Sequence, residues 1–370
     1  MDWRIKFING IIMFLDLLFT FFIAFAILFL MRKVARKVGL VDKPSGRKLH
    51  TGNIPLVGGV AICITIVNYI YTHPGMINHA NLYMCCIIGL TFIGALDDRF
   101  DLSVKIRMAV QAFISFAMIY YAGANLHTLG NLIGFGNIDL GYLSTVITIF
   151  AVIGCINAFN MVDGIDGLLG GLSIVTFASL GILLSLAGEE SLSYLCLLLV
   201  VCMIPYIVMN LGLVGRERKV FMGDAGSMMI GFTVIWLLIG ASQTPGNAMI
   251  RPVTALWLIA VPLMDMVAIM IRRVKQGKSP FKPDREHLHH ICQRLGCSPT
   301  QTLILICSIA SVFAGIGVIG EVFLIPEFLM FYGFVILFTA YLLVLINYCN
   351  VMNFFRRKLN LPEKKYSINQ

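Results

Sequence analysis

The residues best suited to chemistry lie in four short polar segments of an otherwise apolar chain. The first segment holds three carboxylates in five residues, Asp97-Asp98-Arg99-Phe100-Asp101, and Lys105 and Arg107 follow it. Carboxylates this close repel one another, so a divalent cation or the nearby basic side chains would stabilise them. The D-D-x-x-D spacing is that of enzymes that bind diphosphates through magnesium. A solvated loop start is the alternative interpretation.

The second segment places amides and carboxylates at regular intervals. Asn157, Asn160 and Asp163 recur every three residues, which predicts one broad polar stripe on a helix. Asp166 follows, and Gly164 lets the chain leave the helix close to a ligand. Capping of a helix end would explain one Asn or Asp, but four polar groups in ten residues indicate a binding site.

The third segment combines glycines with a carboxylate after a basic run. Gly223 and Gly226 bracket Asp224, and Arg216, Arg218 and Lys219 precede them. Glycines here allow backbone N–H groups at the start of a helix to approach an anion, while the Asp224 carboxylate faces a metal. A simple helix N-cap is the alternative role for Asp224.

The fourth segment is a histidine loop. Lys282 and Arg285 precede His287, His289 and His290. Two of the histidines can share a helix face, as zinc ligands do, but no cysteine and no third ligand at the usual spacing joins them. We therefore interpret the histidines as donors to a phosphate or a sugar, with the two cations beside them.

One further carboxylate, Asp265, lies seven residues before Arg272. That separation places both side chains on nearly the same helix face. A structural ion pair is the interpretation that we favour over a substrate role.

The elements that position these segments are membrane helices. Of the 370 residues, 58% are hydrophobic and only 13% are charged, and apolar runs of about 20 residues are long enough to cross a bilayer as helices. The runs lack the alternation of a membrane barrel. We predict an all-α polytopic integral membrane protein with about eleven transmembrane helices near 8–30, 54–71, 82–96, 108–122, 143–160, 168–187, 191–212, 227–241, 252–271, 302–320 and 328–350.

The distribution of basic residues predicts how these helices are oriented. Of the 28 Lys and Arg residues, 25 fall in alternate connections and in the C-terminal tail. By the positive-inside rule these segments are cytoplasmic, which puts the N-terminus in the periplasm and the C-terminus in the cytoplasm. The net charge of +9 then suits a membrane lipid surface, and nucleic acid is not needed to explain it. We expect one domain, 1–370, with cytoplasmic catalytic loops at 31–53, 97–107, 157–167, 213–226 and 272–300.

In this order, the four segments resemble the polyprenyl-phosphate N-acetylhexosamine-1-phosphate transferases, a glycosyltransferase 4-like family. The resemblance rests on Asp97-Asp98, Asn157–Leu168, Phe221–Ser227 and His287–His290, and it extends to Val41–Pro44 and Pro55–Gly59. It implies transfer of N-acetylglucosamine 1-phosphate from UDP-GlcNAc to undecaprenyl phosphate, with Mg²⁺ or Mn²⁺, in the bacterial inner membrane. The products would be undecaprenyl-diphospho-GlcNAc and UMP, in the first membrane step of O-antigen lipopolysaccharide and enterobacterial common antigen synthesis.

The resemblance also implies roles for individual residues. Asp224 and Asn160 would lie near the metal and the diphosphate, and the other acidic residues would form the catalytic set. In that set Asp97 and Asp98 would lie near the lipid phosphate, and Asp163 and Asp166 beside the nucleotide. The remaining expected substrate-binding residues are Lys105, Arg107, Asn157, Lys282, Arg285, His287, His289 and His290.

Several alternatives stay open at this point. A lipid phosphate is already mostly dianionic at pH 7, which favours a single displacement, but an aspartyl covalent intermediate is not excluded by the residues. A membrane prenyltransferase would share the Asp-rich magnesium site, although it has no use for the histidine loop. A transporter would carry its polar groups near the middle of the membrane. The exact sugar and the oligomeric state, a homo-oligomer included, are also open.

Overall fold

Helix α8 (Gly223–Gln243) is the central element of the protein, and most of its residues are buried. Its sequence is apolar on every side, as expected of a helix that other helices surround. Two neighbouring helices approach its first turn closely because glycines meet there. A Cβ atom on Gly59 would lie 2.0 Å from the Cα atom of Gly226, and one on Gly94 would lie 2.4 Å from the Cα atom of Ala225. The third segment is therefore held at the middle of the bundle.

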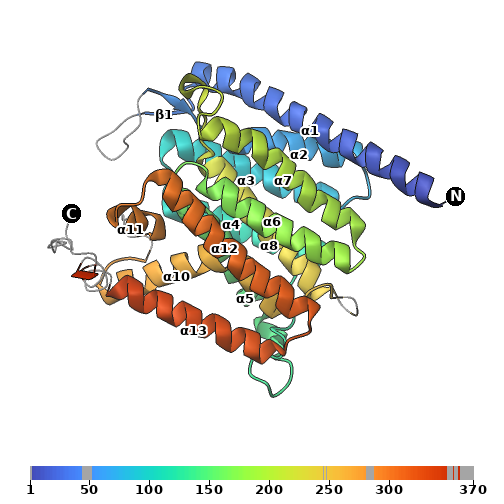
Figure 1. Cartoon of the computed structure of the whole chain (residues 1–370), viewed down its shortest axis with the longest axis vertical. Helices are drawn as coiled ribbons and strands as arrows, with labels where there is room; N and C mark the ends of the chain where they lie inside the picture. The colour runs from blue at the N-terminus through green and yellow to red at the C-terminus, as the bar shows by residue number, and fades with distance from the viewer. Residues whose placement is uncertain are drawn as a thin grey trace.

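The other helices pack around α8 or around its neighbours (Figure 1). The computed structural model describes residues 2–43, 52–244, 246, 248–280, 287–347, 353 and 357–358. Within these residues the helices besides α8 are α1 (Asp2–Val38), α2 (Gly58–Thr72), α3 (Ala80–Phe100), α4 (Val104–Ala122), α5 (Ser144–Met161), α6 (Leu168–Leu186), α7 (Glu190–Asn210), α9 (Pro252–Leu258), α10 (Ala260–Lys275), α11 (Leu288–Arg294), α12 (Pro299–Val322) and α13 (Glu327–Ile346). Two short 3-10 helices, η1 (Gly141–Leu143) and η2 (Arg216–Arg218), and the antiparallel strands β1 (Val41–Asp42) and β2 (Ile54–Pro55) complete the list.

The prediction of a polytopic helical membrane protein is confirmed. Each of the eleven predicted ranges coincides with a helix or, for 252–271, with the pair α9 and α10. Eight of the described helices are long and apolar enough to span a membrane, and the count is nine if α9 and α10 form one span. That pair is bent by 82°, a break that the continuous apolar pattern did not predict. The helices α2 and α4 are not among these candidates, and α2 is the shorter of the two.

The polar segments meet at one end of the bundle. Strand β1 and helix α11 lie at this end in Figure 1, and the labelled N-terminus lies at the other. Helices α3 and α5 end here, and α8 and α11 begin here. Helix α3 runs from Phe100 at this end to Ala80 at the opposite end, so the two ends are separated by roughly 30 Å along the helix axis. The described residues of the four polar segments therefore lie at one end of the bundle, and their cytoplasmic placement stays a prediction.

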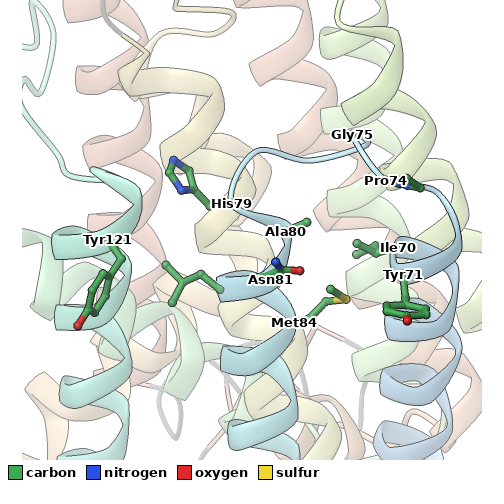
Figure 2. A pocket seen from close by; sticks show the side chains of 10 residues that line it. Ile70, Tyr71, Pro74, Gly75, His79, Ala80, Asn81, Met84 and Tyr121 are labelled. Carbon is green, nitrogen blue, oxygen red and sulfur yellow. The ribbon is translucent and has the colours of Figure 1, made fainter.

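A cavity of about 660 Å³ opens at the opposite end of α3. Figure 2 shows Tyr71 of α2 and Tyr121 of α4 on either side of His79 and Asn81. The two tyrosines are 78% and 67% exposed, which is typical of aromatic side chains at a membrane–water boundary. The cavity lining contains none of the predicted site residues, so we place the candidate active site at the other end.

Candidate active site

Asp98 joins the first segment to the third. Its Oδ1 atom accepts a hydrogen bond from the backbone N–H of Asp224 at 2.9 Å, and its Oδ2 atom accepts from Ala225 at 3.3 Å. These are free N–H groups of the first turn of α8, where a negative charge is favoured. Gly223 has φ of 74°, and a Cβ atom there would lie 2.3 Å from Asp98 Oδ2. The anion that the glycines were predicted to admit is therefore, in this structure, the protein's own carboxylate.

Arg107 connects the adjacent carboxylate to the same place. Asp97 is buried, and its Oδ2 atom accepts a hydrogen bond from Arg107 Nη1 at 2.7 Å, while Oδ1 accepts from the Leu102 N–H at 2.7 Å. The same Nη1 atom lies 3.4 Å from Asp224 Oδ2. Lys105, two residues before Arg107 on α4, is exposed. One guanidinium thus lies between two carboxylates of the cluster and compensates only part of their charge.

The two asparagines of the second segment have different surroundings. Asn160 Nδ2 donates to Asp224 Oδ1 at 2.7 Å and to Ser227 Oγ at 2.8 Å. Asn157 lies one turn deeper, where its Nδ2 atom donates to Gln111 Oε1 at 2.9 Å and to the Ile153 carbonyl at 2.7 Å. Asn160 therefore belongs to the carboxylate cluster. Both amide hydrogens of Asn157 are used inside the protein, and only its carbonyl oxygen is left for a substrate.

Asp163 differs from the sequence prediction in one respect. Helix α5 ends at Met161, so Asp163 lies beyond the helix and does not continue its polar stripe. Within the described part of the chain its carboxylate makes no hydrogen bond or ion pair. Burial, with the charges of Asp98 and Asp166 beside it, raises the pKa of Asp163 to about 7. A cation would therefore stabilise the ionised form of this carboxylate.

Asp166 is paired and belongs to the rim of the cluster. Its Oδ2 atom accepts a hydrogen bond from Lys219 Nζ at 2.6 Å, and this ammonium also lies 5.1 Å from the centre of the Phe221 ring. Asn210 connects the segment that carries Asp166 to the segment that carries Lys219. Its Oδ1 atom accepts from the Gly167 N–H at 2.5 Å, and its Nδ2 atom donates to the Val220 carbonyl at 2.8 Å.

The histidine segment lies against the second segment. A Cβ atom on Gly164 would be 2.1 Å from His289 Nε2, so the ring lies directly over the backbone that follows Asp163. Burial, with His290 and His287 nearby, lowers the pKa of His289 to about 3, which keeps the ring neutral at pH 7. Its Nε2 atom is buried and has no hydrogen-bond partner among the residues that the structure describes. The predicted cations Lys282 and Arg285 lie outside the described residues.

His287 is held by Asp265, the carboxylate that we expected to pair with Arg272. The partners that the structure shows for Asp265 are His287 Nδ1 at 2.8 Å, the Leu288 N–H at 3.1 Å and Tyr341 OH at 2.6 Å. The sequence reasoning placed Asp265 on the correct helix but did not connect it to the histidine segment. That connection is made by residues 22 and 76 positions away in the chain.

Sequence reasoning also missed Gln111, Asn210, Lys219 and Tyr341. The first two are polar residues within otherwise apolar helices, at 2% exposure each. A buried amide in a membrane helix is costly unless it is bonded, so these lone residues were a usable signal. Lys219 was noted only as part of a basic run, and no feature of the sequence singled out Tyr341.

The cluster was tested for its fit to the divalent cation that the family resemblance implies. Within the described residues no three His, Cys, Asp or Glu side chains converge as a ready-made metal site. Mg²⁺, however, is commonly held by one or two carboxylates together with substrate phosphates and water. Asp163 has no hydrogen-bond or ion-pair partner in the described part of the chain, and Asp224 is held by an amide and by a guanidinium at 3.4 Å. Oxygen donors with uncompensated negative charge fit a hard cation that arrives with a diphosphate.

The chain is similar to known proteins over most of its length. The glycosyl transferase family 4 model matches residues 80–242, which include three of the four polar segments. The chain is 50% identical over 335 residues to the undecaprenyl-phosphate alpha-N-acetylglucosaminyl 1-phosphate transferase of Yersinia pestis, covering 90% of this chain and 91% of the relative. The enzyme of the same name from Escherichia coli strain K12 is 48% identical, covering 88% and 89%. That from Haemophilus influenzae is 46% identical, covering 93% and 97%.

Proposed function

Because the chain belongs to glycosyl transferase family 4, we propose that it transfers N-acetylglucosamine 1-phosphate from UDP-N-acetylglucosamine to undecaprenyl phosphate. The products are undecaprenyl-diphospho-N-acetylglucosamine and UMP. The observation that carries the proposal is the junction of Asp98 with the first turn of α8, around which Asp97, Asp224 and Arg107 gather. The relatives named for this reaction cover nearly the whole chain, so the proposal assigns 1–370 to one catalytic domain.

The chemistry that this site must perform is mainly positioning and charge neutralisation. The second pKa of a phosphate monoester is about 6, so the lipid phosphate is already a nucleophile at pH 7. A single in-line displacement then requires that the lipid phosphate and the diphosphate of the nucleotide sugar, both anions, are held together in a fixed geometry. Arg107 supplies a positive charge between Asp97 and Asp224. The residues 162–167 between α5 and α6 form the Asp163 loop. The neutral His289 and its neighbours supply polar groups on the side of this loop.

A divalent cation, Mg²⁺ or Mn²⁺, belongs to the proposal. Asp224 and Asp163 are the carboxylates that would hold it, with Asn160 orienting Asp224. Such an ion neutralises diphosphate charge and stabilises the leaving UMP. The residues of the chain then have separate tasks: Asp98 keeps the start of α8 in place, and Arg107 keeps Asp97 turned towards Asp224.

The orientation in the membrane is also part of the proposal. The charge distribution supports eleven crossings of the bacterial inner membrane, a periplasmic N-terminus and a cytoplasmic C-terminus. The polar end of the bundle then faces the cytoplasm, where a nucleotide sugar is available. The pathway role, the first membrane step of O-antigen and enterobacterial common antigen synthesis, rests on the family resemblance.

The test is an incubation of purified protein with undecaprenyl phosphate, Mg²⁺ and a panel of UDP-sugars. Formation of UMP and a glycolipid in equal amounts, with UDP-N-acetylglucosamine as the preferred donor, supports the proposal. Release of inorganic diphosphate from a prenyl donor would indicate a prenyltransferase. Uptake of substrate into vesicles without any chemical product would indicate a transporter.

A further inference from the structure

Asp265 is a buried carboxylate whose three hydrogen bonds connect three helices. It belongs to α10, its Tyr341 partner to α13, and its two other partners to the start of α11. The carboxylate is 2% exposed, so its charge depends on these donors. Tyr341 OH and the Leu288 N–H share the Oδ1 atom, while His287 Nδ1 contacts Oδ2. Both oxygens of the carboxylate therefore accept hydrogen bonds, and donors from two other elements fix the orientation of the Asp265 side chain.

The start of α11 depends on this carboxylate. Helix α11 has only seven residues, and its N-cap residue, His287, makes no side-chain capping bond of its own. A helix this short is unstable in isolation. Asp265 supplies the missing acceptor from another helix by binding the Leu288 N–H, and it binds the His287 ring at the same time. One carboxylate therefore fixes both the backbone and the imidazole at the first turn of α11.

This anchor determines where the other histidines lie. The rings of His287 and His289 are parallel, with centres 5.8 Å apart and an interplanar angle of 3°. His289 in turn lies over Gly164, beside Asp163. A shift of the α11 start would move both rings away from the Asp163 loop. Within the described residues Asp265 makes no hydrogen bond or ion pair with the carboxylate cluster, so it acts on the site through His287 and the start of α11.

We propose that Asp265, supported by Tyr341, is a positioning residue for the donor side of the active site. With the Nδ1 proton of His287 directed to Asp265, the Nε2 atom is the ring nitrogen left for the sugar-phosphate part of the donor. The inference rests on the proposed transferase function. It adds Asp265 as the residue that holds the histidine segment in place against the Asp163 loop.

The test begins with Asp265→Asn, which keeps the shape but offers one acceptor oxygen to three donors. We expect kcat/KM for UDP-N-acetylglucosamine to fall about 10-fold to 100-fold, the usual cost of losing a residue that orients a site histidine. The loss should reside mainly in KM for the nucleotide sugar, with KM for undecaprenyl phosphate within about 2-fold of wild type. Tyr341→Phe removes one donor and should reduce the same quantity by roughly 3-fold to 10-fold.

A double-mutant cycle separates positioning from general destabilisation. If Asp265 acts through the first turn of α11, the loss in kcat/KM of the double variant Asp265→Asn with His287→Ala should be clearly smaller than the product of the two separate losses. Tyr194→Phe is the matched control, because Tyr194 OH donates to Asp16 Oδ2 at 2.6 Å, the same length as the bond from Tyr341 to Asp265. It should leave both KM values unchanged. Additive losses, or equal losses in Tyr194→Phe and Tyr341→Phe, would overturn the proposal.

A spectroscopic readout keeps this inference separate from the proposed function. In protein labelled with ¹⁵N-histidine, the signals absent from His287→Ala belong to His287. Wild type should carry its proton on Nδ1, and Asp265→Asn should change that signal. An unchanged His287 signal overturns the positioning role even if the enzyme is active. If wild type forms no UMP with any UDP-sugar while this signal does change, the transferase proposal fails and the anchor stands.

Discussion

Replacing Asp163 by Asn should make the ligand-free protein more stable, although it removes a residue that we place in the active site. The Asp163 carboxylate has no hydrogen bond or ion pair within the described residues, and its pKa is about 7 against an ordinary value of 3.8. A folded-state pKa above the unfolded-state value means that the folded protein holds the proton more tightly. Stability is then greatest at low pH and falls as the pH rises through 7.

The size of the effect follows from the difference between the two pKa values. A shift from 3.8 to about 7 corresponds to roughly 4 kcal/mol when the group is fully ionised, at about 1.4 kcal/mol for each pKa unit. Between pH 5 and pH 8 the linkage relation gives about 2.6 kcal/mol of that. Asp163 is half-buried, and solvent screening reduces the figure, so we expect about 1 to 2 kcal/mol. That corresponds to a few degrees in Tm.

The measurement is thermal unfolding of wild type and Asp163→Asn in detergent at pH 5 and pH 8, with a chelator present. Wild type should lose stability relative to the variant as the pH rises, and excess Mg²⁺ should reduce that difference because a cation compensates the carboxylate. Asp139→Asn, at an exposed loop position, is the control and should follow wild type. Identical pH dependence of wild type and Asp163→Asn would refute the reasoning.

Three further predictions concern the metal, the orientation and the histidines. Asp224→Asn should abolish turnover in a protein that still inserts, because a cation loses a charged ligand; near-normal UMP release at ordinary Mg²⁺ would remove Asp224 from the metal site. A cysteine at Ser279 should react with an impermeant reagent only from the cytoplasmic side, and periplasmic labelling would invert the topology. Replacing His287, His289 or His290 by Ala should lower kcat/KM for the nucleotide sugar, with activity surviving a zinc-selective chelator; stoichiometric zinc that is lost together with activity would assign the histidines to a metal.

The sequence was sufficient to predict the helices and to locate the polar segments near helix ends. Long apolar runs predict membrane helices because the bilayer requires them, and each predicted range contains a helix. Glycines at Gly223 and Gly226 predicted a close approach of an anion to a helix start, and Asp98 is the group found there. The break between α9 and α10 was not predicted, since both halves are apolar and no composition change marks Ile259.

What the sequence could not supply is the pairing of polar groups across helices. Arg107 donates a hydrogen bond to Asp97, which is 10 residues away in the chain, and it lies near Asp224, which is 117 residues away. Both contacts depend on how α3, α4 and α8 pack. The assignment of Asp265 to Arg272 followed from helix periodicity, which describes one helix only. Its partners on α11 and α13 come from tertiary packing. Local spacing therefore identifies which residues are polar and near a helix end, but not which of them meet.

The carboxylates of the cluster fall into two groups, those that have hydrogen-bond donors within the described part of the protein and one that has not. Asp97, Asp98 and Asp166 each have donors within the protein, and they hold α3, α8 and the loops together. Asp163 has none. A protein selected only for stability would pair or remove such a group, since an uncompensated carboxylate costs free energy. A cation that binds with a diphosphate would supply the missing charge only when substrate is present, which couples metal binding to the donor.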